Sequence, residues 1–263
     1  MGKIVLIPAA GEGRRFRQAG LPIAKPLICA RGQTLLEHTL ACFSLTEDDH
    51  LILAVQRHHG VRQRLEAELH SRYPDVTIHW FELERLLPGQ LATTAAALEA
   101  VLQTSELDPS LPLLVHNCDT GFQWQPGLAS IEGFASMAVF PAEGTHWSFG
   151  QPDPEDSQQA IAIAEKRRIS DLASIGLYGF STAQRFLKEA KAALLSDDTL
   201  QGEYYIAPML QKALTKGMKV SLPRVDGVKI YGTPEELCQC FKLSLESLKS
   251  ENGLPSASHP PDN

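Results

Sequence analysis

The chain contains no hydrophobic run long enough to cross a bilayer. Its longest apolar stretches, residues 4–10 and 111–115, have the length of β-strands, whereas a membrane-spanning helix needs about 20 apolar residues. No positively charged leader precedes a signal-type hydrophobic segment, so we expect a cytoplasmic protein with no membrane partner. Five cysteines in 263 residues, an odd number, do not form a disulfide framework.

The chain also lacks the surplus of positive charge that nucleic-acid binding requires. Its net charge is -7, and affinity for a phosphate backbone comes from many accumulated cations. A hydrophobic content of 43% is ordinary for a globular protein, and the length allows one large domain, which we assign to residues 1–250. The tail at 251–263, ENGLPSASHPPDN, has no periodic apolar face, and we expect it to be disordered.

What the chain does have is an apolar strand that runs into a glycine-rich, cationic loop over residues 4–26. Glycines let the backbone approach phosphate oxygens and direct amide N–H groups at them, while arginine and lysine supply positive charge. The pattern favours a nucleotide-binding loop over its alternative, a βα loop with incidental arginines on a solvated face. The residues that carry this pattern are Gly11, Gly13, Arg14, Arg15, Arg17 and Lys25.

Two better-known glycine loops are excluded by the residues around Gly13. Phe16 stands where the dinucleotide-binding fingerprint needs its third glycine, so the close packing of helix on strand in that motif is missing. The P-loop requires Gly-Lys followed by Ser or Thr, and this region has no such sequence.

Short β-branched runs alternate with helical patterns, which predicts an α/β fold with a mainly parallel, mixed sheet flanked by helices. Thr34 and Glu37 have the spacing of a capping box at the first helix, and Thr233 is the expected N-cap of the last helix, with Glu236 reaching back to it. The strands are expected at 3–8, 51–55, 76–81, 113–116, 137–140, 160–164 and 175–180, and the helices at 35–43, 61–70, 92–102, 182–195, 204–216 and 234–248.

The glycine loop, Pro8 to Phe16, together with Lys25-Pro26, resembles the signature of the sugar-phosphate nucleotidyltransferases, or nucleoside-diphosphate-sugar pyrophosphorylases. The resemblance covers about residues 3 to 245 and implies a glycosyltransferase-A-like fold. It also implies transfer of a nucleoside monophosphate from a triphosphate to a sugar phosphate or another small phosphorylated metabolite, with Mg²⁺ as cofactor and release of pyrophosphate. Six further segments match in order: Pro88–Thr93, Asn117–Asp119, Glu165–Lys166, Gly176–Tyr178, Gly202–Tyr205 and Gly232–Leu237.

The resemblance assigns roles to individual residues. Arg15 and Lys25 are the expected catalytic cations, and Asp119, at the carboxyl end of a predicted strand, is the expected metal ligand. The residues alone allow other interpretations. Arg15 could be a surface cation, Lys25 could simply precede a turn, and Asp119 could cap a helix. Gln90 could either bind the base or cap the helix that follows it. Nucleotide contacts are expected from Ala10, Gly11, Gly13, Arg14, Gly89 and Gln90, and acceptor contacts from Glu165, Lys166, Gly176, Glu203 and Tyr204.

The sequence departs from the family pattern at two positions. Arg14 occupies the place of a small hydroxyl residue, and Ile230 stands where many members carry a second metal-binding aspartate, so that Asp226 is a candidate substitute. We expect His58 and His59 to lie on a solvated face rather than to bind a metal.

Three functional hypotheses follow from the resemblance and its departures. The first is the nucleotidyltransferase, and the Gly202–Tyr205 and Gly232–Leu237 motifs are most similar to its capsule and surface-polysaccharide branch, whose acceptors need not be sugars. The second is a glycosyltransferase that uses a nucleotide sugar, and the third is a non-catalytic nucleotide-binding regulatory protein. The base, the acceptor and the oligomeric state, a homo-oligomer included, are left open by the sequence.

Overall fold

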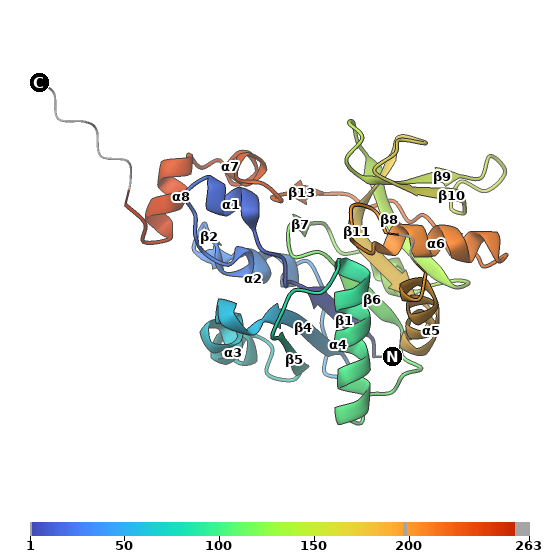
Figure 1. Cartoon of the computed structure of the whole chain (residues 1–263), viewed down its shortest axis with the longest axis horizontal. Coiled ribbons are helices and arrows are strands. Elements are labelled where there is room, and N and C mark those ends of the chain that lie inside the picture. Colours follow the sequence, from blue (N-terminus) through green and yellow to red (C-terminus); the bar gives the residue numbers. More distant parts are fainter. Residues whose placement is uncertain (1, 197–198, 256–263) are drawn as a thin grey trace, which may run out of the picture.

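The computed structural model describes residues 2–196 and 199–255, which fold around one mixed sheet (Figure 1). Within these residues the sheet has nine strands, and its main path runs β10-β9-β11-β6-β1-β4-β5. Four neighbouring strands are parallel: β1 (Ile4–Pro8), β4 (His50–Gln56), β5 (Thr77–Leu83) and β6 (Leu113–His116). The antiparallel part consists of β8 (Ala135–Pro141), β9 (Ser148–Pro152), β10 (Ala160–Glu165) and β11 (Leu172–Phe180), and the short β12 (Val220–Ser221) pairs with β8.

The position of β1 in the centre of the sheet explains its composition. Ile4 to Ile7 are all fully buried, because a central parallel strand is covered on both faces and therefore reads as a continuous apolar run. The expected α/β class with a mainly parallel, mixed sheet is confirmed. β9 was not predicted, and its sequence, with Gly150 and Pro152 in five residues, gives little strand signal.

Helices cover both faces of the sheet and enclose two apolar clusters. The first cluster includes buried side chains of α4 (Gln90–Thr104), α5 (Ala183–Leu194) and α6 (Ile206–Thr215). The second includes those of α2 (Leu35–Leu40) and α3 (Val61–Arg72). The predicted capping box of α2 is confirmed, because Thr34 Oγ1 accepts from Glu37 N at 3.3 Å and the Glu37 carboxylate accepts from Thr34 N at 2.9 Å.

Short elements complete the edge at which the parallel strands end. The glycine loop leads into α1 (Arg14–Gln18), and the 3-10 helices are η1 (Lys25–Leu27), η2 (Arg57–His59) and η3 (Pro126–Ala129). Two-stranded sheets pair β2 (Cys29–Ala30) with β3 (Gln33–Thr34) and β7 (Thr120–Gly121) with β13 (Lys229–Ile230). The second pair brings the C-terminal part of the chain beside the end of β6.

The single last helix expected over 234–248 is wrong, because the chain forms α7 (Pro234–Phe241) and α8 (Leu245–Glu251). Lys242 adopts a left-handed conformation with φ 52°, which ends α7, and Ser244 Oγ then caps α8 by accepting from Ser247 N at 3.0 Å. Both helices and α1 contribute to a third apolar cluster around Phe16, Leu237 and Leu248, on the left of Figure 1.

The boundary expected after residue 250 lies too early. Glu251 is the last residue of α8 and its carboxylate accepts from Arg31 N at 2.8 Å. Asn252 makes two hydrogen bonds to the backbone of Cys29, both 2.8 Å long, and Leu254 packs on the third cluster. Residues 256–263 lie outside the described residues, and the expectation of a disordered tail is restricted to them. Among the described helices, none combines the length and the apolar character that a membrane span needs.

Candidate active site

The glycine loop is held in place from below by a buried glutamine. The amide of Gln56, the last residue of β4, donates to Ala10 O at 2.7 Å and to Glu12 Oε1 at 2.8 Å. These bonds fix the path of the loop where it leaves β1. Gln56 was not predicted as a site residue, although a polar residue directly after the apolar run 51–55 is a feature visible in the sequence.

A cavity of about 530 Å³ opens above this loop, at the carboxyl ends of β1 and β6. Its volume is in the range of small-ligand pockets, and its position is the one at which α/β sheets bind ligands. The lining contains the predicted catalytic, metal-binding and nucleotide-binding residues: Ala10, Gly11, Gly13, Arg14, Arg15, Lys25, Gly89, Gln90 and Asp119.

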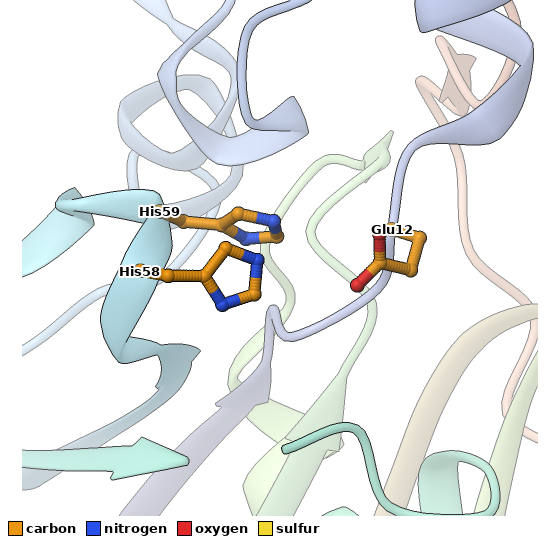
Figure 2. A group of neighbouring side chains, drawn as sticks. All are labelled: Glu12, His58 and His59. Carbon is orange, nitrogen blue, oxygen red and sulfur yellow. The ribbon is translucent and has the colours of Figure 1, made fainter. Parts of the chain in front are cut away.

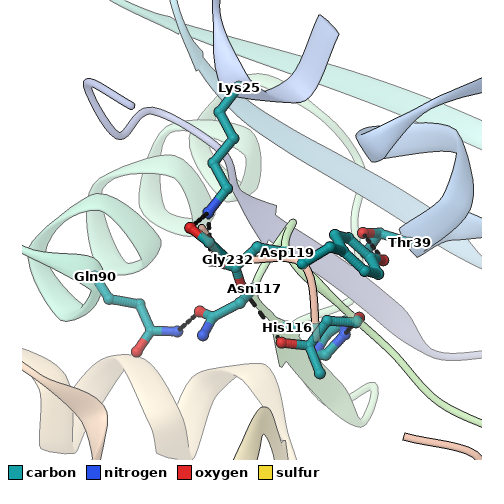
Figure 3. Close-up of polar contacts among 9 residues, drawn as sticks. Lys25, Thr39, Gln90, His116, Asn117, Asp119 and Gly232 are labelled. Atoms are coloured by element: carbon teal, nitrogen blue, oxygen red, sulfur yellow. Dashed lines mark hydrogen bonds and ion pairs between the residues drawn. The ribbon is translucent and has the colours of Figure 1, made fainter. Parts of the chain in front are cut away.

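Lys25 and Asp119 form an ion pair at the floor of this cavity. The Lys25 Nζ lies 2.6 Å from Asp119 Oδ2 and 3.1 Å from Gly232 O, and it is 5.4 Å from the centre of the Phe16 ring. Figure 3 shows the lysine reaching down from η1 to the carboxylate, which lies in the turn between β6 and β7. Ninety-four residues separate the two partners in sequence.

The pair reinforces the charged state of both groups. Burial by itself would lower the pKa of Lys25, but the neighbouring Asp119 carboxylate outweighs this effect and raises it. Burial likewise acts to raise the pKa of Asp119, and the Lys25 ammonium outweighs it, so the pKa of the carboxyl is lowered. A cation and an anion are therefore both present at neutral pH.

The arginines of the loop divide into two groups. Arg14 and Arg15 line the cavity, and within the described residues neither has an ion-pair partner. Arg17 instead pairs with Glu12, with Nη2 and Oε2 2.6 Å apart. We expected all four loop cations to contribute to nucleotide binding. For Arg17 this expectation is corrected, because Arg17 does not line the cavity.

Gln90 and Gly89 are placed at the far side of the cavity. The Gln90 side chain donates to Asn117 Oδ1 at 2.6 Å (Figure 3) and does not cap α4, whose N-cap is Gly89. Gly89 has φ 95°, and a Cβ there would lie 2.6 Å from Tyr204 O. Only glycine fits this conformation and this close approach.

A second cavity of about 260 Å³ adjoins the first. It contains Glu165, whose carboxylate accepts from Ser148 Oγ, and burial raises the pKa of this carboxyl. Gly176 lies beside Asn117, with φ 77° and no room for a Cβ, which would be 2.3 Å from Asn117 Nδ2. The two cavities share part of their lining: Arg15, Gln90, Asn117, Asp119, Tyr205 and Gly232.

Three residues expected to contact the acceptor lie elsewhere. Tyr204 packs partly buried against the first apolar cluster and donates to Ser196 O at 3.1 Å, while Tyr205 lines both cavities. Lys166 is exposed and donates to Tyr205 Oη at 2.8 Å, one side chain away from the second cavity. Glu203 lines the first cavity rather than the second.

A second carboxylate stands near Asp119 although Ile230 provides none. Ile230 pairs with Thr120 across β7 and β13 and lines the second cavity. The predicted N-cap of α7 is confirmed, because Thr233 Oγ1 accepts from Glu236 N at 3.2 Å. The Glu236 side chain lines the second cavity and, among the described residues, makes no hydrogen bond back to Thr233, so its expected capping role is corrected. Asp226, the expected substitute, is exposed, and its residue contacts Gln123 through the backbone.

The oxygen atoms near Gly232 suit a hard divalent cation. A Cβ placed on Gly232 would lie 3.4 Å from Asp119 Oδ2 and 3.2 Å from Glu236 Oε2, so the two carboxylates flank this glycine. Mg²⁺ prefers one or two carboxylates completed by phosphate and water oxygens. The side chains present therefore fit the ion that the sequence led us to expect.

The site offers no activated thiol. Cys118 lines the first cavity, but burial raises its pKa to about 12. The thiol is therefore protonated at neutral pH and is a poor nucleophile. The turn that carries it is braced by the buried His116, whose Nε2 lies 2.7 Å from Thr120 O.

No protein-family model matches the chain, but single proteins do. The chain is 26% identical over 228 residues to the bifunctional protein GlmU of Ralstonia pickettii and 28% identical over 228 residues to that of Halorhodospira halophila. Each match covers 82% of this chain but only 46% and 43% of the relative. The chain thus spans less than half the length of these curated relatives.

Solved structures extend the similarity over most of the chain. A nucleoside-diphosphate-sugar pyrophosphorylase from Vibrio cholerae RC9 superposes with a TM-score of 0.80 and 27% identity, covering 90% of this chain and 99% of the other. The inositol-1-phosphate CTP transferase from T. maritima has a TM-score of 0.66 at 16% identity, covering 97% of each chain. The expected glycosyltransferase-A-like nucleotidyltransferase fold is thereby confirmed.

Proposed function

We propose that this protein is a nucleotidyltransferase that transfers a nucleoside monophosphate from a triphosphate to a small phosphorylated acceptor, such as a sugar phosphate. The observation that carries the proposal is the junction of the two cavities. Arg15 and Asp119 belong to both linings, and Lys25 contacts Asp119 there at 2.6 Å. A reaction that joins two bound molecules requires such a junction, with charge concentrated on it.

In the proposed reaction, an acceptor phosphate oxygen attacks the α-phosphorus of the triphosphate. The bond from that phosphorus to the bridging oxygen breaks, and pyrophosphate leaves with the electron pair. The nucleophile is already an anion, so the residues need to supply orientation and positive charge rather than a general base. This requirement agrees with a site that has cations but no activated thiol.

Each cation has a defined task in this proposal. Arg14 and Arg15, which have no ion-pair partner among the described residues, bind the triphosphate oxygens. Lys25 neutralises the charge that develops on the transferring group, and its ammonium moves from Asp119 to the phosphate as the substrate enters. Mg²⁺, held by Asp119 and Glu236, supplies further positive charge to the phosphate oxygens.

The acceptor occupies the second cavity in this proposal. Glu165 is partly buried there and accepts from Ser148, and it offers a carboxylate to a hydroxyl or an ammonium group of the acceptor. The motifs around Glu203 and Gly232 support the finer assignment to the capsule and surface-polysaccharide branch, with the reaction in the cytoplasm.

A pyrophosphate-release screen tests the proposal directly. CTP, dTTP, UTP, GTP and ATP are each combined with sugar phosphates and with phosphorylated amino alcohols and amino acids, in the presence of Mg²⁺. We expect one base and one acceptor class to release pyrophosphate in equal amount to the adduct formed. Consumption of a nucleotide sugar without pyrophosphate would identify a glycosyltransferase instead, and nucleotide binding with no turnover for any pair would identify a regulatory protein.

A pair of variants links the activity to the cavity. Arg15→Ala removes a cation from the shared lining, and we expect a loss of about 10²-fold in kcat/KM. Arg17→Ala removes a cation that lies on the same short helix but outside the lining, where it pairs with Glu12. For this variant we expect a change of less than about threefold. Equal losses in both variants would contradict the assignment of the junction.

A further inference from the structure

One cluster of metal-ligating side chains, which does not include Asp119, lies between the glycine loop and η2, and its member Glu12 also lines the first cavity. Glu12 projects from the loop between Gly11 and Gly13, and His58 and His59 come from η2, directly after β4. One ligand atom from each of the three side chains lies within 4.8 Å of the other two. Figure 2 shows both imidazoles extending from η2 toward the Glu12 carboxylate. We expected both histidines to lie on a solvated face; His58 is exposed, whereas His59 is half-buried.

His59 carries an unsatisfied polar atom. Its Nδ1 is buried and has no hydrogen-bond partner among the described residues. An unpaired buried nitrogen costs free energy, and it is an exception that calls for a specific explanation. A bound metal ion is one partner that removes this cost, because imidazole is the most common metal ligand in proteins.

The geometry around the cluster also restrains its members. Gln56 holds Glu12 Oε1 at 2.8 Å, and Arg17 holds Oε2 at 2.6 Å. The His58 and His59 rings are 4.3 Å apart between centroids. Hydrogen-bonded carboxylates are typical of metal sites, where outer partners orient the ligands.

We propose that Glu12, His58 and His59 form a binding site for a borderline transition-metal ion such as Zn²⁺. Two imidazoles and one carboxylate with a position left for water are a known donor set for zinc, and nitrogen ligands discriminate against Mg²⁺, which prefers oxygen. The site is therefore chemically distinct from the oxygen ligands at Asp119 and Glu236. Zinc–ligand bonds of about 2.0–2.2 Å require the three side chains to close slightly on the ion.

Binding at this site has a structural consequence. The ion connects the glycine loop to η2, two segments separated by more than 40 residues in sequence. It also competes with the Arg17 guanidinium for the Glu12 carboxylate. Occupation therefore tightens the loop that lines the first cavity and makes its stability dependent on zinc, whatever reaction the cavity supports.

The test is a titration of the whole chain with Co²⁺, whose visible absorption reports the ligand geometry, and with Zn²⁺, followed by melting temperature. Excess Mg²⁺ is present throughout to occupy oxygen-only sites, and the pH is about 7.5 so that free imidazoles are largely unprotonated. The variants are His58→Gln, His59→Gln and Glu12→Gln. His70→Gln is the matched control, since His70 is exposed on α3 and, among the described residues, makes a single hydrogen bond, to Glu66 O at 2.7 Å.

We expect one Co²⁺ per chain, a visible spectrum without sulfur-to-metal charge-transfer bands, and a rise in melting temperature with Zn²⁺. Each of the three ligand variants should bind at least about tenfold more weakly, while His70→Gln binds as the wild type does. His58 is exposed, so its variant should fold and keep the test decisive if His59→Gln does not. Equal Co²⁺ affinity in wild type and His58→Gln, or a spectrum dominated by cysteine ligands, would overturn the proposal.

Discussion

The two cavities meet at Asp119 but differ in how they are built and charged. The first is formed mainly by loops that follow the parallel strands β1 and β6, and it contains the cations Arg14, Arg15 and Lys25. The second is formed by β9, β10, β11 and α7 around Glu165 and Glu236, with Arg15 as the cation from the shared wall. The difference agrees with the proposed function, in which the first cavity binds the triphosphate and the second binds the small acceptor.

The difference also shows how position in the sheet determines what a cavity can hold. Parallel strands end at one edge and bring their following loops together, which concentrates backbone amides and loop cations at a single place. The second cavity instead receives side chains from antiparallel strands, with Tyr178 inside β11 and Glu165 at the end of β10. Variants on either side should therefore have separable effects.

The largest effect is expected at the junction, from Lys25→Ala. We predict that this variant folds but loses about 10²–10³-fold in kcat, because a positioned charge on the transferring group is removed. Circular dichroism checks the fold and steady-state kinetics check the turnover. Nearly normal turnover in a folded Lys25→Ala variant would show that the lysine has no role in the mechanism. The junction of the two cavities would then not be the place where its charge acts on the reaction.

The next effect concerns the two proposed metal ligands, Asp119 and Glu236, which flank Gly232. We predict that Asp119→Asn lowers Mn²⁺ affinity about 100-fold and that Glu236→Gln lowers it about tenfold, because the first lies at the junction and the second at the edge. Calorimetry with a non-hydrolysable triphosphate measures both. Asp226→Asn is the control, since this residue is exposed. Full metal affinity in Glu236→Gln, with a loss in Asp226→Asn, would show that the loop before β13 supplies the second carboxylate.

A smaller pair of effects would sharpen the comparison by opposing the two cavities. We predict that Arg14→Ala raises the KM for the triphosphate about tenfold and leaves the KM for the acceptor unchanged, whereas Glu165→Gln does the reverse. The reason is that each residue lines only one of the cavities. Initial rates over a grid of both substrates give the two constants. Parallel changes in both constants for either variant would contradict separate binding sites.

The smallest effect is the pH dependence of stability at the junction. The Lys25 ammonium holds the pKa of Asp119 below its ordinary value of 3.8. The ionised carboxylate therefore stabilises the fold above pH 3.8, and this stabilisation is lost as the pH falls from 3.8 through the lowered pKa. Asp119 raises the pKa of Lys25 above 10.5, so the alkaline loss begins above that pH. We predict that Asp119→Asn melts about 2–4 °C below the wild type at pH 7 and that the gap narrows progressively as the pH falls below 3.8. A gap that is independent of pH would indicate lost packing rather than lost charge.

The sequence predicted more of the first cavity than of the second. The residues of the glycine loop are close together in sequence, so glycine spacing and cation density already predicted this part of the lining of the first cavity. Gln56 and Glu236 were missed or misassigned, because their roles depend on partners that the chain brings close only through the sheet and α7. Glu236 has the spacing of a capping residue, and local spacing does not reveal that its side chain turns to the cavity instead.

The sequence by itself determined the α/β class, the order of the main strands, the glycine loop and the position of Asp119 after β6, because these features depend on local periodicity and on contiguous residues. Only the tertiary structure decided that Arg14 and Arg15, but not Arg17, line the first cavity, and that Tyr205 rather than Tyr204 lines it. It alone also brought Glu12 close to His58 and His59. Those outcomes depend on side-chain directions between segments distant in sequence, and no local pattern encodes the distance between two such segments once they are packed.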